Sequence, residues 1–190
     1  MKLFGTILVI GVMLGAGFFV LSRESDDEVP AQINSSEKIS ALTSEKEQEV
    51  IPASYKKYQN AKYGFSILYP ETLAQKEIDE GGNASTITFQ NPAEGKGFQI
   101  FVVPYEGEQV SEERFRQDIP SHVRKNTEEV IVDGGKGAAF YSTDLGLGDT
   151  REVWFIKNGY LFEVTTLKAL EADLLEMLRT WEWKMGSGTI

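Results

Sequence analysis

The chain has 190 residues, a formal net charge of −10 at pH 7 and no cysteine. The lack of cysteine excludes disulfides, thiol nucleophiles and cysteine-based metal sites within this sequence. The acidic charge, without a basic stripe, argues against a nucleic-acid partner and against a domain that lies flat on anionic lipid.

An uncharged run near the start of the chain predicts a membrane anchor. The nineteen residues 3–21 carry no charge, and as a helix they would span roughly 28 Å, close to the thickness of the bilayer interior. We therefore expect residues 1–22 to be an N-terminal transmembrane helix, with a cleaved signal segment or a buried core helix as the alternatives. Lys2 and the terminal amine favour an N-terminus inside the cell, which leaves the globular part outside the cytoplasm.

The segment that follows is predicted to be a disordered tether. Residues 23–56 are rich in Ser, Glu and Lys and have no aromatic residue before Tyr55. Such a segment buries too little apolar surface to offset the entropy lost when its backbone becomes ordered. We expect it to act as a solvated spacer between the membrane and the next domain.

Residues 57–184 hold most of the large apolar side chains outside the anchor and are predicted to form one domain, followed by a flexible tail at 185–190. This length is near the commonest domain size. Asn158-Gly159 between two alternating runs is a strong hairpin signal, because both turn residues need positive φ. Alternation or short apolar runs predict strands at 63–69, 85–90, 98–104, 129–132, 137–143, 151–157 and 160–166.

Two helices are expected among these strands. Ser111 can cap a first helix that begins "EERFRQDI", with two acidic residues in its first turn. Leu167, Leu170, Leu174 and Leu178 recur at helical spacing, and a short strand around Trp183 follows them. Several strands are apolar on both faces, so the sequence predicts an α+β domain whose antiparallel sheet is covered by helices on both sides.

Two stretches of the domain resemble PsbP-like proteins. They are "YQNAKYGFSILYP" at 58–70 and "LLEMLRTWEWK" at 174–184. The resemblance extends over 57–184 and implies an α/β/α sandwich that serves as a non-enzymatic assembly or binding module. Plant members of that family are lumenal and carry no anchor when mature, whereas this chain is predicted to be tethered, so a photosynthetic role does not follow.

The motifs of the common catalytic families do not occur in the sequence. There is no G-x-S-x-G elbow and no H-E-x-x-H motif, and the only histidine, His122, has no local nucleophile beside it. The stretch "DGGKG" at 133–137 lacks the spacing and the hydroxyl residue of a phosphate-binding loop, and we interpret it as a turn. We expect no cofactor and no enzymatic activity.

One loop could hold a metal ion. The stretch "STDLGLGDTRE" at 142–152 places Asp144, Asp149 and Glu152 around two glycines. Carboxylate oxygens on a flexible loop suit Ca²⁺, although the spacing is not that of an EF-hand. A plain solvated hairpin loop is the alternative.

The sequence thus predicts a membrane-tethered extracytoplasmic binding or assembly module with an unknown protein partner. A small-ligand or Ca²⁺-binding domain is the alternative, and a pocket with converging polar groups would favour it. An enzyme is the third class, and two carboxylates buried together would favour that one.

Overall fold

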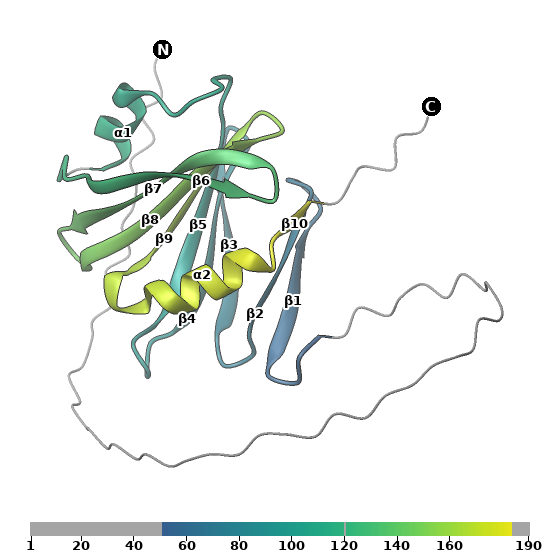
Figure 1. Cartoon of the computed structure of the whole chain (residues 1–190). Helices are drawn as coiled ribbons and strands as arrows, with labels where there is room; N and C mark the ends of the chain where they lie inside the picture. Colours follow the sequence, from purple (N-terminus) through teal and green to yellow (C-terminus); the bar gives the residue numbers. More distant parts are fainter. Residues whose placement is uncertain (1–50, 120, 184–190) are drawn as a thin grey trace, which may run out of the picture. The chain divides into compact units, whose positions relative to one another are not determined.

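The computed structural model describes residues 51–119 and 121–183, which form two antiparallel sheets and two α-helices (Figure 1). The smaller sheet has the order β1-β2-β10 and the larger one the order β3-β4-β5-β9-β8-β7-β6. The strands of the smaller sheet are β1 (Tyr55–Asn60), β2 (Phe65–Pro70) and β10 (Glu182–Trp183). Those of the larger sheet are β3 (Ala74–Gly81), β4 (Ala84–Asn91), β5 (Lys96–Pro104), β6 (Lys125–Val132), β7 (Gly135–Asp144), β8 (Gly148–Lys157) and β9 (Tyr160–Leu167).

Both predicted helices are present. Helix α1 (Glu112–Asp118) connects the β5 and β6 regions, and the Ser111 hydroxyl accepts a hydrogen bond from the backbone N–H of Arg114 at 3.1 Å, as its capping role requires. A 3₁₀ turn, η1 (Lys168–Leu170), leads from β9 into α2 (Glu171–Arg179). The predicted α+β class with an antiparallel sheet is confirmed.

The main core lies between the larger sheet and two covering elements, which are α2 and the smaller sheet. Trp181, two residues after the end of α2, stacks on Phe65 of β2 with ring centroids 4.3 Å apart. The Trp181 ring also meets Phe155 of β8 and Phe162 of β9 edge-on, at 5.0 and 5.7 Å. One indole therefore contacts both sheets.

The covering of the larger sheet differs from the expected pair of helical layers. One face is covered by α2 together with the three-stranded sheet, and the opposite face by α1. The smaller sheet can take the place of a helix because Phe65 and Ile67 of β2 are fully buried against the larger sheet. A single helix packs on the second face, and it is only seven residues long.

The predicted Asn-Gly hairpin is confirmed. Asn158 and Gly159 both have positive φ, 53° and 79°, and join β8 to β9. The strand predictions missed β3, because its side chains are mostly exposed and charged and only Ile78 is half-buried. They also missed β1, whose first two residues lie within the predicted tether. Both are strands at the edge of a sheet, where apolar alternation is not required.

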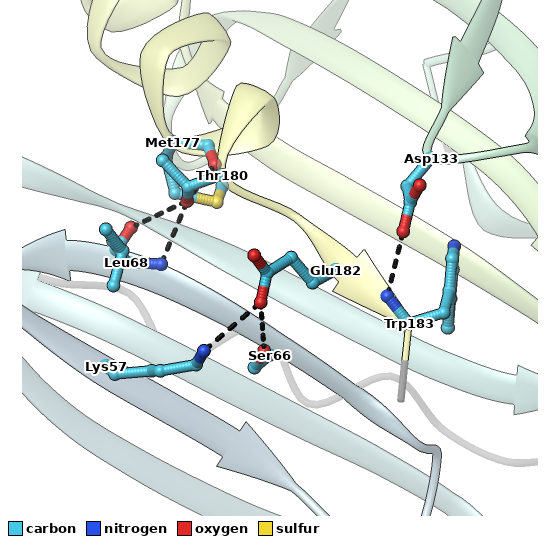
Figure 2. Close-up of polar contacts among 8 residues, drawn as sticks. All are labelled: Lys57, Ser66, Leu68, Asp133, Met177, Thr180, Glu182 and Trp183. Atoms are coloured by element: carbon cyan, nitrogen blue, oxygen red, sulfur yellow. Dashed lines mark hydrogen bonds and ion pairs between the residues drawn. The ribbon is translucent and has the colours of Figure 1, made fainter. Parts of the chain in front are cut away.

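The C-terminal strand β10 joins the two sheets through side chains (Figure 2). Glu182 accepts hydrogen bonds from Lys57 of β1 and Ser66 of β2, at 3.1 and 3.4 Å. The backbone N–H of Trp183 donates to the Asp133 carboxylate at 2.9 Å, and Asp133 lies in the turn between β6 and β7. The short strand is therefore held by both sheets.

Within the described residues, no helix is long and apolar enough to span a membrane. The predicted anchor at 1–22, the predicted tail at 185–190 and nearly all of the predicted tether lie outside the described residues.

Candidate functional site

Helix α1 packs on the second face of the larger sheet through aromatic contacts. Phe115 stacks on Trp154 of β8 with ring centroids 4.9 Å apart, and it meets Phe140 of β7 edge-on at 5.4 Å. Ile119 and Leu161 complete this small apolar cluster. These contacts fix the position of α1 and bring its polar side chains over the sheet.

Three charged side chains meet beneath α1. Arg114 forms ion pairs with Asp118, one helical turn later, and with Glu163 of β9, the latter at 3.2 Å. The exposed fractions are 1% for the Asp118 side chain and 8% for that of Glu163. Two carboxyl groups thus share one guanidinium, so the site has more acidic than basic groups. Water barely reaches the two carboxyl groups, which makes an unbalanced charge there costly.

The two carboxyl groups are also close enough to hydrogen-bond to each other. Burial raises the pKa of Glu163 well above its usual value, and the charge of Asp118 raises it further. Burial also raises the pKa of Asp118, but the hydrogen bond with Glu163 and the Arg114 guanidinium oppose that rise. The directions of the two pKa shifts therefore favour a proton on Glu163 and a negative charge on Asp118.

Glu152 of β8 is a third buried carboxyl group on this face. Its oxygens accept hydrogen bonds from Thr150 at 2.8 Å, Thr165 at 2.6 Å and the Trp154 indole at 3.2 Å. Burial raises the pKa of Glu152, although all three donors stabilise its charged form. Unlike Glu163, this carboxylate is satisfied by neutral donors.

The cluster has one feature that is expected of a catalytic site. Two carboxyl groups buried together are the feature expected of an enzyme, but a catalytic pair must also meet a substrate. Asp118 and Glu163 do not line either of two hollows of the described domain, one beside α1 and one beside the start of α2. No group of three or more His, Asp or Glu side chains in the described residues is arranged to hold a metal ion.

The three residues of the predicted Ca²⁺ loop have separate surroundings. Asp144 caps the hairpin turn, where its Oδ1 accepts from the backbone N–H of Gly146 at 2.7 Å and of Leu147 at 2.8 Å. Asp149 is exposed and accepts from the Thr143 hydroxyl at 3.2 Å. Glu152 lies inside the domain, so the geometry gives the Ca²⁺ hypothesis no support.

A second ionic cluster, centred on the buried Arg151, lies at the other face of the larger sheet. Arg151 of β8 is ion-paired with Glu128 of β6 and with Glu171 of α2, the latter at 3.0 Å. Its guanidinium also lies 4.7 Å from the centre of the Tyr141 ring, and the Tyr141 hydroxyl donates to Glu171 at 2.8 Å. This cluster fastens the start of α2 to the sheet.

The sequence analysis missed Arg114, Asp118 and Glu163. A signal for Glu163 was present, because it interrupts an apolar run at 160–164 and alternation places it on the same face as Leu161. A charged residue at a buried strand position needs a partner. The partners on α1 could not be identified, since they lie far away in the sequence.

Comparison with known proteins finds solved structures with a similar fold but no match by sequence. No known protein-family model matches the chain, and no curated protein sequence matches it. The solution structure of cyanobacterial PsbP (CyanoP) from Synechocystis sp. PCC 6803 superposes with a TM-score of 0.50 at 14% identity, over 71% of this chain and 95% of that one. A crystal structure from Bacteroides thetaiotaomicron VPI-5482 gives a TM-score of 0.47 at 19% identity, over 72% of this chain and 51% of that one.

The resemblance inferred from residues 58–70 and 174–184 therefore agrees with the architecture. Those segments form β1, β2 and the end of α2 with β10, which together make the smaller sheet and its junction with the core. At this level of identity the likeness concerns the fold alone. The described domain has a PsbP-like fold.

Proposed function

We propose that the chain is a non-enzymatic binding or assembly module, held at the membrane by residues 1–22 and exposed outside the cytoplasm, with a protein partner. The observation that carries this proposal is the enclosure of the acidic groups. The carboxyl groups of Asp118, Glu152 and Glu163 are buried and bound by side chains of this chain. Carboxyl groups enclosed in this way affect the stability of the domain, so we expect a partner to bind to its surface.

A hairpin tip offers one surface for a partner. Leu145, in the turn between β7 and β8, is 92% exposed, and Leu147 beside it is also exposed. The side chain of Asp144 fixes the turn through its two backbone hydrogen bonds. Because Leu145 is exposed to water, a partner that covers its side chain lowers the free energy of the complex.

Small-ligand binding is the second candidate function. A hollow beside α1 has converging polar groups, which is the feature that would favour it. Its Ca²⁺ form stays a prediction that the arrangement of Asp144, Asp149 and Glu152 does not favour.

The first experiment tests location. Membranes that contain the full chain are washed with alkaline carbonate, and the retained product is sequenced from its N-terminus. We expect the chain to stay with the washed membrane. In a separate assay on whole cells, we expect protease added to the medium to digest the domain. A released product that begins near Arg23 would replace the anchor with a cleaved signal.

The second experiment tests the surface. Crosslinked partners of the full chain in detergent are compared for wild type, the double variant Leu145→Ser with Leu147→Ser, and Ile131→Ser as a control. Ile131 is 72% exposed but lies on β6, outside the hairpin tip. We expect one partner band to disappear in the double variant alone. Equal bands in all three proteins would remove the hairpin tip from the proposal.

A further inference from the structure

A hollow of about 460 Å³ lies beside α1 and the segment that follows it. None of its lining residues belongs to the buried carboxyl cluster. Phe115 and Ile119 are the buried apolar side chains of this hollow. The other lining residues are Glu112, Arg116, His122 and Arg124.

The polar lining is mostly basic, although the whole chain is acidic. Two guanidinium groups and the only imidazole of the sequence face one carboxylate, that of Glu112. The side chains of Arg116 and His122 have no hydrogen bond or ion pair with any other described residue. These donors are therefore available to a ligand.

The second guanidinium is held in place. The centre of the Arg124 guanidinium lies 4.1 Å from the centre of the Phe115 ring, and Phe115 stacks in turn on Trp154. Arg124 also donates to Glu112 at 2.6 Å. A planar guanidinium fixed on an aromatic ring loses less side-chain entropy when it binds an anion than a freely moving one does.

The turn after α1 brings these groups together. The backbone N–H of His122 donates to the carbonyl of Ile119 at 2.9 Å, and His122 has a φ of 54°. This left-handed residue turns the chain, so that His122 and Arg124 lie next to α1 and line the same hollow as Arg116.

We propose that this hollow binds the oxyanion group of a small organic molecule, a phosphate or a carboxylate. Arg116 and Arg124 would donate to the oxygens, and the His122 imidazole would add an N–H. The volume exceeds that of an inorganic phosphate, which leaves room for an organic part beside Phe115 and Ile119. Glu112 competes with the ligand for Arg124, so the removal of its charge in Glu112→Gln should increase the affinity for the ligand. This inference goes beyond the proposed protein partner, and either one can fail without the other.

The single histidine makes the test specific. The full chain in non-ionic detergent is labelled with ¹³C-histidine, so the spectrum contains one imidazole signal, that of His122. Sodium phosphate, sodium acetate and glycerol phosphate are titrated separately against sodium chloride of equal ionic strength. We expect a saturable shift with at least one oxyanion, no saturable shift with chloride, and the tightest binding for glycerol phosphate if the organic part contributes.

Variants distinguish a site from a general salt effect. Arg116→Gln and Arg124→Gln should each weaken binding about tenfold, as the loss of one charge-assisted hydrogen bond implies. The matched control Arg179→Gln, an exposed arginine in the last turn of α2, should leave binding unchanged. Glu112→Gln should tighten binding several-fold, since the competing carboxylate is gone.

Three outcomes would overturn the proposal. They are shifts that match those of sodium chloride, an affinity that neither Arg116→Gln nor Arg124→Gln lowers, and weaker binding in Glu112→Gln. Melting curves check the fold of each variant. Glu112→Gln keeps the test decisive if an arginine variant unfolds, because a merely structural contact predicts the opposite sign.

Discussion

The two faces of the seven-stranded sheet are covered in chemically different ways. Beneath α2 and the smaller sheet the contacts are mostly aromatic, and Phe65, Phe155, Phe162 and Trp181 pack against one another. Beneath α1 a smaller aromatic cluster is joined by buried carboxyl groups and one arginine. We therefore expect the first face, which holds the larger apolar cluster, to contribute more of the stability, and the second to make stability depend on pH.

The largest expected effect is on the first face. Trp181→Ala should lower the free energy of unfolding by about 3–5 kcal/mol, since it removes a large buried ring that contacts both sheets. That loss is comparable to the whole stability of a marginal domain. Urea unfolding followed by far-UV circular dichroism measures it.

Trp181→Phe is the matched control. The buried indole N–H of Trp181 has no hydrogen-bond partner among the described residues, so phenylalanine keeps an aromatic ring and removes an unsatisfied donor. It should cost clearly less than alanine. An alanine variant as stable as wild type would show that the first face does not carry the core.

The next effect is a pH dependence that belongs to the second face. Burial raises the pKa of Asp118, Glu152 and Glu163, so the folded state keeps protons that the unfolded chain has already lost. This stabilisation is fully present below the ordinary carboxyl pKa of about 4.5 and declines as pH rises toward the folded values. We expect lower stability at about pH 8 than at about pH 5, with a slope of up to about 1.4 kcal/mol per pH unit for each proton.

The variant Glu163→Gln tests whether Glu163 causes this dependence of stability on pH. Glutamine keeps the shape and a donor toward Asp118 but cannot ionise, so the variant should lose less stability between these pH values than wild type does. Glu176→Gln, an exposed residue of α2, is the control and should keep the wild-type slope. A slope unchanged by Glu163→Gln would place the titrating group elsewhere.

A smaller effect concerns the junction between the sheets. Asp133→Ala removes the acceptor for the Trp183 N–H and places alanine at a φ of 42°, and it should cost about 1–2 kcal/mol. Asp133→Asn retains an acceptor and tolerates positive φ, so most of the stability should remain. If both variants melt like wild type, the Asp133 contact does not stabilise β10, and its contacts with β1 and β2 hold it.

The smallest expected effect is that of calcium. A site that binds only the folded state would add about 2.7 kcal/mol at a hundredfold excess over Kd, a shift of several degrees in a domain of this size. Since Asp144 already caps its turn and Glu152 is buried, we expect equal melting temperatures in millimolar calcium and in EDTA. A calcium shift that disappears in Asp144→Asn with Asp149→Asn would restore the metal site.

Much of the architecture was predictable, because it is encoded locally. The turn at Asn158-Gly159, the cap at Ser111 and the alternation in β2 and β4 each depend on a few neighbouring residues. The edge strands β1 and β3 were missed since they bury little. No short stretch of the sequence indicates that a three-stranded sheet, in addition to α2, covers one face of the larger sheet.

The carboxyl cluster was less predictable for a different reason. Glu163 and Asp118 are 45 positions apart, and their contact exists only because Phe115 positions α1 over Trp154. The sequence shows an acidic residue within an apolar strand, but the arginine that partners it is visible only in three dimensions. Glu152, in contrast, was noticed twice, as a candidate ligand at the end of the acidic loop and as a member of the predicted strand 151–157, and it lies buried in β8.

The position of β1 has a mechanical consequence. β1 is an outer strand of the smaller sheet and pairs with β2 alone, so tension applied at residue 51 would load the β1–β2 ladder first. The side-chain bonds from Tyr58 and Asn60 to Glu77 of β3 would resist next. Force could therefore detach β1 while the seven-stranded sheet stays folded, so that the detached strand would lengthen the chain before the rest of the domain unfolds.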